Sequence, residues 1–264
     1  MLDLANMPVS LVEPSTTQAR AIGVLLDRRG VRNVTVFDSG AALLTHAAGA
    51  PPALVISALY LPDMTAGELI ERLRRAQGDD RTPFILISSE TDAATLDPLR
   101  QSGLCAILPK PFSDAQLEAA LRATVDYGDD TAPLELPDVP VERLRVLLVD
   151  DSGAARRFNR RLLQNLGLVD ITEAENGRIA SGLIGEARFD LVVTDYHMPE
   201  MDGRALAKYI RDESWQQDLP LLMITSEAQP ERLAALRAAG VTAICGKPLD
   251  PADLRGKLQA MLGG

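Results

Sequence analysis

Five polar residues in the second half of the chain each come at the end of a short apolar run. Asp150 and Asp151 follow the first run, Asp195 the third, Thr225 the fourth and Lys247 the fifth. Three carboxylates in one crevice repel one another unless a cation joins them, and hard oxygen ligands of this kind suit Mg²⁺, which keeps positions for water and phosphate. With a hydroxyl and an ammonium group beside them, the set predicts attack of Asp195 on phosphorus to form an aspartyl phosphate.

The elements that must position these residues alternate along the chain. The apolar runs are 146–149, 171–172, 191–194, 221–224 and 242–245, and helical patterns cover 152–165, 176–187, 202–213, 228–238 and 251–262. Strands separated by helices of ten or more residues indicate βαβ crossovers and a parallel sheet. Continuously apolar strands agree with a sheet covered on both faces. In such a doubly wound sheet, ligands collect at the carboxyl ends of the strands.

The chain contains two copies of this plan. The segment Leu191–Pro199 repeats the pattern of Leu54–Pro62 at an offset of 137 residues, and the same offset relates Lys110–Pro111 to Lys247–Pro248. One register kept without insertion over about eighty residues indicates a tandem duplication. We predict a first domain at 1–126, a connector at 127–143 and a second domain at 144–264.

The connector is expected to be extended and semi-stiff. It contains three prolines and five acidic residues against one basic residue. Proline and like charge both favour an extended chain over a packed one. The last predicted helix ends close to Gly264, so no effector domain is expected after it.

Four motifs of the second copy carry a family resemblance. They are Leu148–Ser152, Thr194–Gly203, Ile224–Ser226 and Gly246–Pro248. With these motifs, residues 144–264 resemble the receiver domain of bacterial two-component response regulators, which has a flavodoxin-like fold. The predicted fold class is therefore α/β: two flavodoxin-like (βα)5, doubly wound parallel-sheet domains in tandem.

The resemblance implies a role for each matching residue. Asp195 would be the phosphoacceptor, and Asp150 and Asp151 would bind Mg²⁺ together with Asp195 and the backbone carbonyl of His197. Mg²⁺ is thus the expected cofactor.

Two further residues would contact the phosphoryl group by the same resemblance. They are Thr225 and Lys247, and the Lys247–Pro248 bond would be cis. Receivers often carry an aromatic residue three positions before this lysine, where the chain has Ile244. The resemblance implies that phosphorylation changes the face formed by the segments 228–238, 242–245 and 251–262. Without the aromatic residue, coupling of the site to this face is less predictable.

The first copy has lost most of the reactive residues. At the offset of 137 residues, the five site positions become Glu13, Pro14, Ala58, Ser88 and Lys110. Alanine cannot accept a phosphoryl group, and one carboxylate of three is a poor magnesium site. We predict a degenerate receiver that keeps the fold, with an ion pair between Glu13 and Lys110. Asp63 in the next loop is expected to face solvent rather than to replace the lost acceptor.

The first predicted helix of the second copy carries four arginines. These are Arg156, Arg157, Arg160 and Arg161, and the first copy has Ala19, Arg20, Gly23 and Val24 in their place. Their spacing puts pairs of them on one helix face. That face is either simply solvated or a docking surface for an acidic phosphodonor protein.

The composition excludes several classes of protein. The 264 residues are 46% hydrophobic and 24% charged, which is typical of a globular fold. A net charge of −10 and an aromatic content of 4% argue against a nucleic-acid partner.

No stretch reaches the roughly 18–20 apolar residues of a membrane span, and the N-terminus lacks the basic start of a signal peptide. Cys105 and Cys245 have no disulfide or zinc spacing. A reduced, cytoplasmic protein without membrane contact is expected.

These patterns together predict a two-component response regulator. A histidine kinase or phosphotransfer protein would phosphorylate Asp195, because neither His46 nor His197 lies in a context typical of a phosphorylated histidine. Output would pass through a downstream target protein or through homodimerisation, as in chemotaxis-type control. No enzymatic activity is expected beyond self-phosphotransfer and autodephosphorylation.

Two alternatives come from other functional classes. A structural adaptor built from two receiver folds would never be phosphorylated, and the intact acidic cluster argues against it. A small-molecule phosphohydrolase would need a cap or substrate pocket, and the helices between the motifs are too short to supply one.

Overall fold

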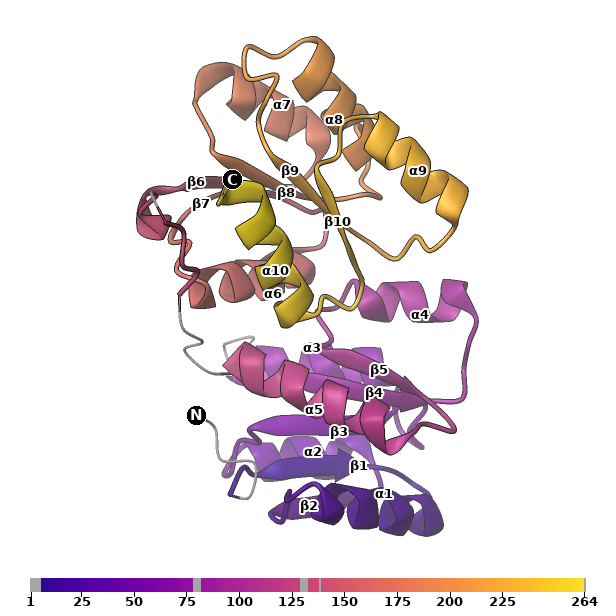
Figure 1. Cartoon of the computed structure of the whole chain (residues 1–264). Helices are drawn as coiled ribbons and strands as arrows, with labels where there is room; N and C mark the ends of the chain where they lie inside the picture. Colours follow the sequence, from indigo (N-terminus) through magenta and orange to yellow (C-terminus); the bar gives the residue numbers. More distant parts are fainter. Residues whose placement is uncertain (1–5, 78–81, 129–132, 138, 264) are drawn as a thin grey trace. The chain divides into compact units, whose positions relative to one another are not determined.

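A five-stranded parallel sheet with helices on both faces forms the centre of each half of the protein (Figure 1). The computed structural model describes residues 6–77, 82–128, 133–137 and 139–263. The chain divides into two compact units, Met1–Asp129 and Asp130–Gly264, which we call the first and second domains. The predicted α/β class, two flavodoxin-like domains in tandem, is confirmed.

The first domain has the strand order β2-β1-β3-β4-β5. Its strands are β1 (Val9–Val12), β2 (Val34–Phe37), β3 (Leu54–Ala58), β4 (Phe84–Ser88) and β5 (Ala106–Pro109). Its helices are α1 (Thr16–Arg28), α2 (Gly40–Ala47), α3 (Ala66–Gln77), α4 (Ala93–Arg100) and α5 (Asp114–Gly128). One core cluster joins α1 and α5 to the sheet, and a second joins α2, α3 and α4 to its other face.

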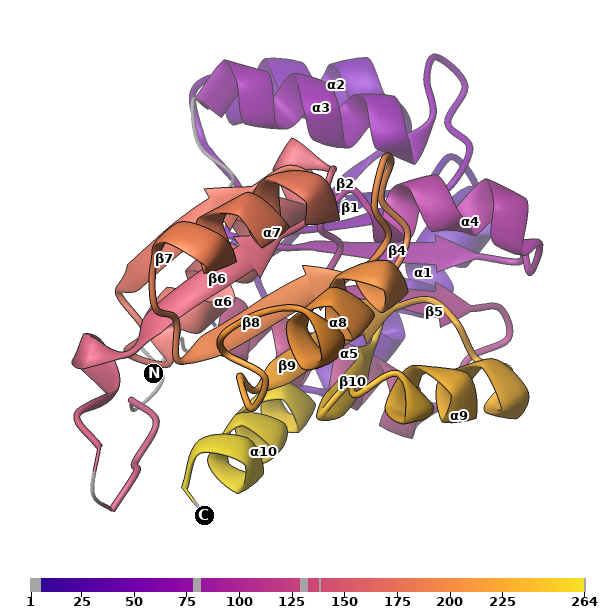
Figure 2. The same ribbon diagram turned by 90° about the horizontal axis from the view of Figure 1, so that it is seen from above.

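The second domain repeats this order as β7-β6-β8-β9-β10. Its strands are β6 (Arg145–Val149), β7 (Asp170–Ala174), β8 (Leu191–Asp195), β9 (Leu221–Thr225) and β10 (Ala243–Gly246). Its helices are α6 (Gly153–Asn165), α7 (Gly177–Glu186), α8 (Gly203–Asp212), α9 (Pro230–Ala238) and α10 (Pro251–Leu262). Helices α7 and α8 lie side by side over a core that also includes α9 (Figure 2), whereas α6 and α10 lie on the opposite face (Figure 1).

The elements of the second domain lie close to their predicted positions. The central strands β8 and β9 are buried along their whole length, which explains their continuous apolar runs. The predicted run 171–172 is too short, because β7 is an edge strand whose partly exposed residues include charged ones. Helices α6, α7 and α8 begin at side-chain caps: Ser152, Asn176 and Asp202 each accept a backbone N–H from the first turn.

The second half of the expected connector is packed rather than extended. Leu134 is buried, and its N–H donates to Leu166 O at 2.8 Å. Val141 is also buried and begins a short 3-10 helix, η1 (Val141–Arg143). Burial of these apolar side chains against the second domain favours contact over the extension that proline and charge predict.

Two further predictions concern the peptide bond before Pro248 and the presence of membrane-spanning helices. The Lys247–Pro248 bond is cis as expected, and so is the Lys110–Pro111 bond of the first domain. Within the described parts of the chain, every helix is too short or too polar to cross a bilayer.

Candidate functional site

The predicted site residues of the second domain meet at the carboxyl edge of the sheet. Asp150 comes directly after β6, Asp195 ends β8 and Thr225 ends β9. Lys247 follows β10. The strand order reverses between β6 and β8, so the residues lie where doubly wound sheets bind their ligands.

Three carboxylates come together at this edge. One oxygen each from Asp150, Asp151 and Asp195 lies within 4.8 Å of the other two. Asp150 and Asp195 are only 1% and 2% exposed, whereas Asp151 is exposed. Two charged groups are therefore buried side by side, with the third on the solvent side of the site.

Lys247 is the cation between the two buried carboxylates. Its Nζ lies 2.9 Å from Asp195 Oδ1 and 3.7 Å from Asp150 Oδ2, and its side chain is 4% exposed. The backbone N–H of Tyr196 donates to Asp195 Oδ1 at 2.7 Å. These two donors fix the direction in which Asp195 presents its carboxylate.

Asp150 has one bonded and one unbonded oxygen. The backbone N–H of Ser152 donates to Asp150 Oδ1 at 2.9 Å. Oδ2 is buried and has no hydrogen-bond partner among the described residues, and Lys247 Nζ is too distant for a good hydrogen bond. A buried carboxylate oxygen without a donor is costly unless a cation binds it.

The site therefore fits a divalent metal ion. Among the described residues, three acids and one base leave the site with two net negative charges. Mg²⁺ is bound by a few carboxylate oxygens and keeps several waters. The unbonded Oδ2 of Asp150, with Asp151 and Asp195 beside it, is the donor set that such an ion requires.

Thr225 is buried at the end of β9. Its Oγ1 accepts the backbone N–H of Glu227 at 3.0 Å, which leaves its O–H as a donor. Glu227 in turn accepts the N–H groups of Ala228 and Gln229 and the guanidinium of Arg232. The loop after Thr225 is thus held by a carboxylate that sequence reasoning had not singled out.

The loop after Asp195 packs closely against α8. The N–H of Gly203 donates to Tyr196 O at 2.9 Å, and a Cβ at Gly203 would lie 2.2 Å from Asp195 O. Only glycine allows this approach. His197 lies in this loop, exposed, with its ring 4.4 Å from that of Tyr196, and the metal-binding role of its carbonyl stays a prediction.

Replacement of Asp150 by Asn is expected to stabilise the metal-free second domain. Burial is the main cause that raises the pKa of Asp150 from 3.8 to about 7; Asp195 also raises this pKa, and Lys247 lowers it. Because the pKa is higher in the folded state, the ionised carboxylate destabilises that state increasingly between about pH 4 and pH 7. We expect the free energy of unfolding at pH 8 to rise by roughly 1–3 kcal/mol in the variant.

Urea unfolding without Mg²⁺ measures this gain. Trp215 is the single tryptophan and lies in the second domain, so its fluorescence reports on that domain in the full chain. The gain should be smaller at pH 5 than at pH 8, and added Mg²⁺ should stabilise the wild type more than the variant. A variant less stable than the wild type at pH 8 would contradict the electrostatic explanation.

The first domain replaces this cluster with one ion pair. Lys110 Nζ lies 3.1 Å from Glu13 Oε2, so the predicted pair is present. Lys110 also donates to Gln18 Oε1, and Ser15 N–H donates to Glu13 Oε1. One acid and one base leave no excess charge, and the only acidic cluster found among the described residues is the one in the second domain.

Asp63 caps a helix. It is exposed, and its two carboxylate oxygens accept the N–H groups of Gly40 and Ala41 at 3.0 and 2.8 Å, at the start of α2. These backbone hydrogen bonds lower the pKa of Asp63. The carboxylate is thus solvent-facing as expected, and its capping role explains its presence without phosphate chemistry.

Arg156 and Arg160 on α6 bind acidic groups of their own domain. Arg156 pairs with Glu173 and Glu175, and Arg160 pairs with Glu173. The sequence did not reveal these pairs because the predicted run 171–172 left out the charged residues at the end of β7. At least these two charges of the docking surface expected for an acidic partner are therefore already paired.

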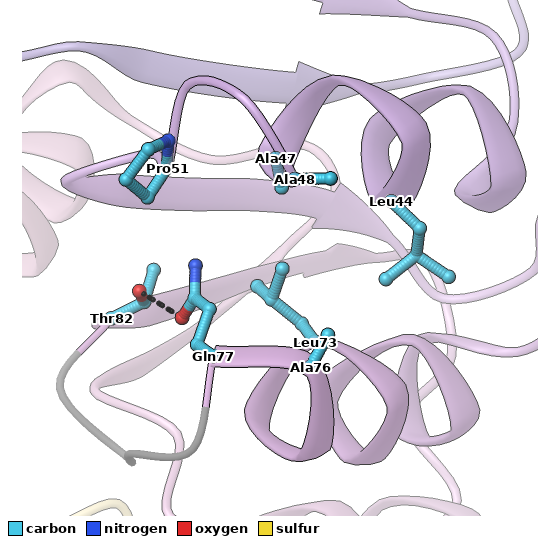
Figure 3. A pocket seen from close by; sticks show the side chains of 8 residues that line it. All are labelled: Leu44, Ala47, Ala48, Pro51, Leu73, Ala76, Gln77 and Thr82. Carbon is cyan, nitrogen blue, oxygen red and sulfur yellow. Dashed lines mark hydrogen bonds between the residues drawn. The ribbon is translucent and has the colours of Figure 1, made fainter.

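One cavity of the first domain is unrelated to the reactive positions. It has a volume of about 530 Å³ and is lined mainly by apolar residues between α2 and α3, with Gln77 and Thr82 hydrogen-bonded at its side (Figure 3). Pro51 and Thr82 precede β3 and β4, so this cavity lies at the amino edge of the sheet. Glu13 and Lys110 lie at the opposite edge.

Comparison with known proteins identifies the family of both domains. The family model for the response regulator receiver domain matches residues 9–122 and again residues 146–259. Chemotaxis protein CheY-3 of Vibrio cholerae is 39% identical over 117 residues, which cover 44% of this chain and 90% of that protein. Chemotaxis protein CheY1 of Helicobacter pylori is 37% identical over 121 residues, which cover 46% and 98%.

Similarity to solved structures also extends over a single domain. The chemotaxis response regulator CheY4 of Vibrio cholerae covers 45% of this chain and 98% of its own, with 36% identity and a TM-score of 0.42.

Proposed function

The chain belongs to the response regulator receiver family, and from this premise we propose that its second domain accepts a phosphoryl group at Asp195. The donor would be a histidine kinase or a phosphotransfer protein. The first domain would keep the receiver fold without phosphorylation, because Ala58 stands where the second domain has Asp195.

The observation that supports this proposal best is the charge of the two pockets. The first domain holds one carboxylate and one lysine, whereas the second holds three carboxylates and one lysine. A domain with only a structural role would need no more than the balanced pair. Two excess negative charges at this edge are costly unless the site binds a divalent cation, which can in turn bind the transferred phosphoryl group.

Each residue would have a definite part in the transfer. A carboxylate oxygen of Asp195 attacks phosphorus, and the new O–P bond forms as the P–N bond to the donor histidine breaks. The Nζ of Lys247, already 2.9 Å from Asp195, donates to a phosphoryl oxygen, and the O–H of Thr225 donates to another. Asp150 and Asp151 would hold Mg²⁺ with Asp195 and the carbonyl of His197. When bound, that ion supplies positive charge to the phosphoryl oxygens.

The product would change the balance between two packings of the domain. The new charge draws the Thr225 hydroxyl and Lys247 toward the phosphoryl group. This movement favours one of the two conformations of the β9–α9 loop. We propose that output passes through protein contacts, with a downstream target or a second copy of the chain. The chemotaxis relatives suggest chemotaxis-type control as the setting.

The proposal also covers organisation and location. We propose that the first receiver spans 1–126, the connector 127–143 and the second receiver 144–264, which agrees with the two family matches. Two buried cysteines, both unpaired, favour a reducing compartment such as the cytoplasm.

Titration with beryllofluoride distinguishes the proposed receiver from a structural adaptor. Beryllofluoride mimics a phosphoryl group on a carboxylate, so a receiver binds it at Asp195 only when Mg²⁺ is present. Calorimetry should give one site per chain with Mg²⁺ and none with EDTA. Absence of binding in both conditions would favour the adaptor.

A further inference from the structure

Arg156 connects the backbone of Asp150 and Asp151 to the end of strand β7. We propose that Arg156 is a positioning residue, which orients Asp150 and Asp151 for Mg²⁺ without contacting the ion or the phosphoryl group. The inference rests on the proposed function and adds a residue to the same site.

The guanidinium binds the backbone that carries both carboxylates. Arg156 Nη1 donates to Asp150 O at 2.7 Å and lies 3.5 Å from Asp151 O. The side chain is only 14% exposed. One donor group therefore holds the carbonyl groups of two successive residues, whose carboxylates belong to the acidic cluster.

The other guanidinium nitrogens anchor Arg156 to the end of β7. Nε donates to Glu173 Oε2 and Nη2 to Glu175 Oε1, both at 3.3 Å. Glu173 is itself held by Arg160 Nη1 at 2.6 Å. Three nitrogens of one planar group reach backbone carbonyls on one side and two carboxylates on the other, an arrangement that the single ammonium group of lysine cannot reproduce.

The first domain provides an internal comparison. It lacks the acid pair and most of this network: Ala19, Gly23 and Val36 stand in place of Arg156, Arg160 and Glu173, and only Glu175 keeps an acidic counterpart, Asp38. The main-chain link is nevertheless the same, because Glu13 N–H donates to Phe37 O at 3.0 Å as Asp150 N–H donates to Ala174 O at 3.2 Å.

The network is therefore not a requirement of the fold. Val36 is 51% exposed on the corresponding strand, and the backbone around it keeps its pairing. The side-chain network occurs in the domain that has carboxylates to orient and is missing from the domain that does not. Outer groups that orient metal ligands typically change metal affinity by about 10–100-fold when removed.

Mg²⁺ calorimetry on full-length variants tests this role. For Arg156→Ala we expect Mg²⁺ affinity at least about 10-fold weaker than wild type. Arg156→Lys keeps the charge but not the three contacts, so it should be weakened almost as much. Arg178→Ala removes an exposed arginine from α7 and is the charge-matched control, with wild-type affinity expected.

A second readout separates positioning from general damage. In phosphorylation by a small phosphodonor, the Mg²⁺ concentration at half-maximal rate should rise about 10-fold in Arg156→Ala, while the rate at saturating Mg²⁺ stays within about threefold of wild type. Urea unfolding followed by Trp215 checks that the variant is folded. Glu173→Val, which copies the first domain, should weaken Mg²⁺ in the same direction and covers the case of an unfolded Arg156→Ala.

The outcomes distinguish the two levels of the proposal. Wild-type protein that binds Mg²⁺, together with folded Arg156 and Glu173 variants of unchanged affinity, would overturn the positioning role alone. Arg156→Lys with full affinity would also overturn it, because charge rather than geometry would then suffice. Wild-type protein without Mg²⁺ binding would overturn the proposed function and this inference together.

Discussion

Replacement of Asp195 by Asn should abolish phosphorylation of the chain. Wild-type protein incubated with Mg²⁺ and a small phosphodonor is expected to gain one phosphoryl group by intact-mass measurement. The variant should incorporate it at least about 10³-fold more slowly, because an amide is not a nucleophile toward phosphorus. The change keeps the shape of the side chain, and the Tyr196 N–H can still donate to the remaining oxygen.

Asp63→Asn provides the matched control for this experiment. Asp63 is an exposed carboxylate in the first domain, in the loop after the position that corresponds to Asp195. The control should be labelled like the wild type. A phosphoryl group that persists in Asp195→Asn would show that another residue is the acceptor.

Replacement of Lys247 by Met should strongly destabilise the metal-free second domain. The buried ammonium lies between Asp195 and Asp150, and methionine fills a similar volume without charge. Removing one partner of a buried ion pair leaves an uncompensated charge, so we expect the free energy of unfolding to fall by roughly 3–5 kcal/mol. Phosphoryl incorporation should fall about 10²-fold, because a donor to the transferred group is lost.

Unfolding followed by Trp215 measures the first effect, and the time course of intact mass measures the second. Added Mg²⁺ should restore part of the stability of Lys247→Met. The matched control is Lys110→Met: the Lys110 side chain is 27% exposed and pairs with the single carboxylate of Glu13. It should leave the Trp215 transition and the labelling unchanged. Wild-type stability and rate in Lys247→Met would contradict the assigned role of Lys247.

The two pockets represent two answers to one electrostatic problem. A carboxylate at the end of the first strand is buried in both domains, as Glu13 and as Asp150. In the first domain a lysine balances it within the chain. In the second domain the corresponding residue, Lys247, faces two buried carboxylates with a third nearby, so one lysine does not balance their charge. We therefore expect the second domain, but not the first, to be stabilised by a bound cation.

Much of this arrangement could be predicted from the sequence because strand ends carry the reactive residues. Continuous apolar runs predict the buried strands, and their parallel pairing brings Asp150, Asp195 and Lys247 to one edge. The offset between the copies also predicts the pair of Glu13 and Lys110, since both positions must share that edge. These inferences depend on register and topology, which a repeated pattern reveals well.

Other features depend on side-chain geometry and could not be predicted in this way. The contacts of Arg156 with Glu173 and Glu175 connect a helix to an edge strand whose own pattern is weak. The burial of Leu134 in the connector opposes the local signal of proline and charge. Asp63 was predicted to face solvent, but its hydrogen bonds to the start of α2 were not predicted. A residue that caps a helix from a distant loop has no fixed sequence spacing from that helix.

A crystal structure of the chain grown with Mn²⁺ and beryllofluoride tests the central claim most directly. Mn²⁺ replaces Mg²⁺ at oxygen ligands and can be located by its anomalous scattering. We predict one anomalous peak in contact with Asp150, Asp151 and Asp195, with beryllium bonded to Asp195 and the first domain without either. Carboxylates that point apart with no ion between them, or beryllofluoride bound elsewhere, would contradict the account.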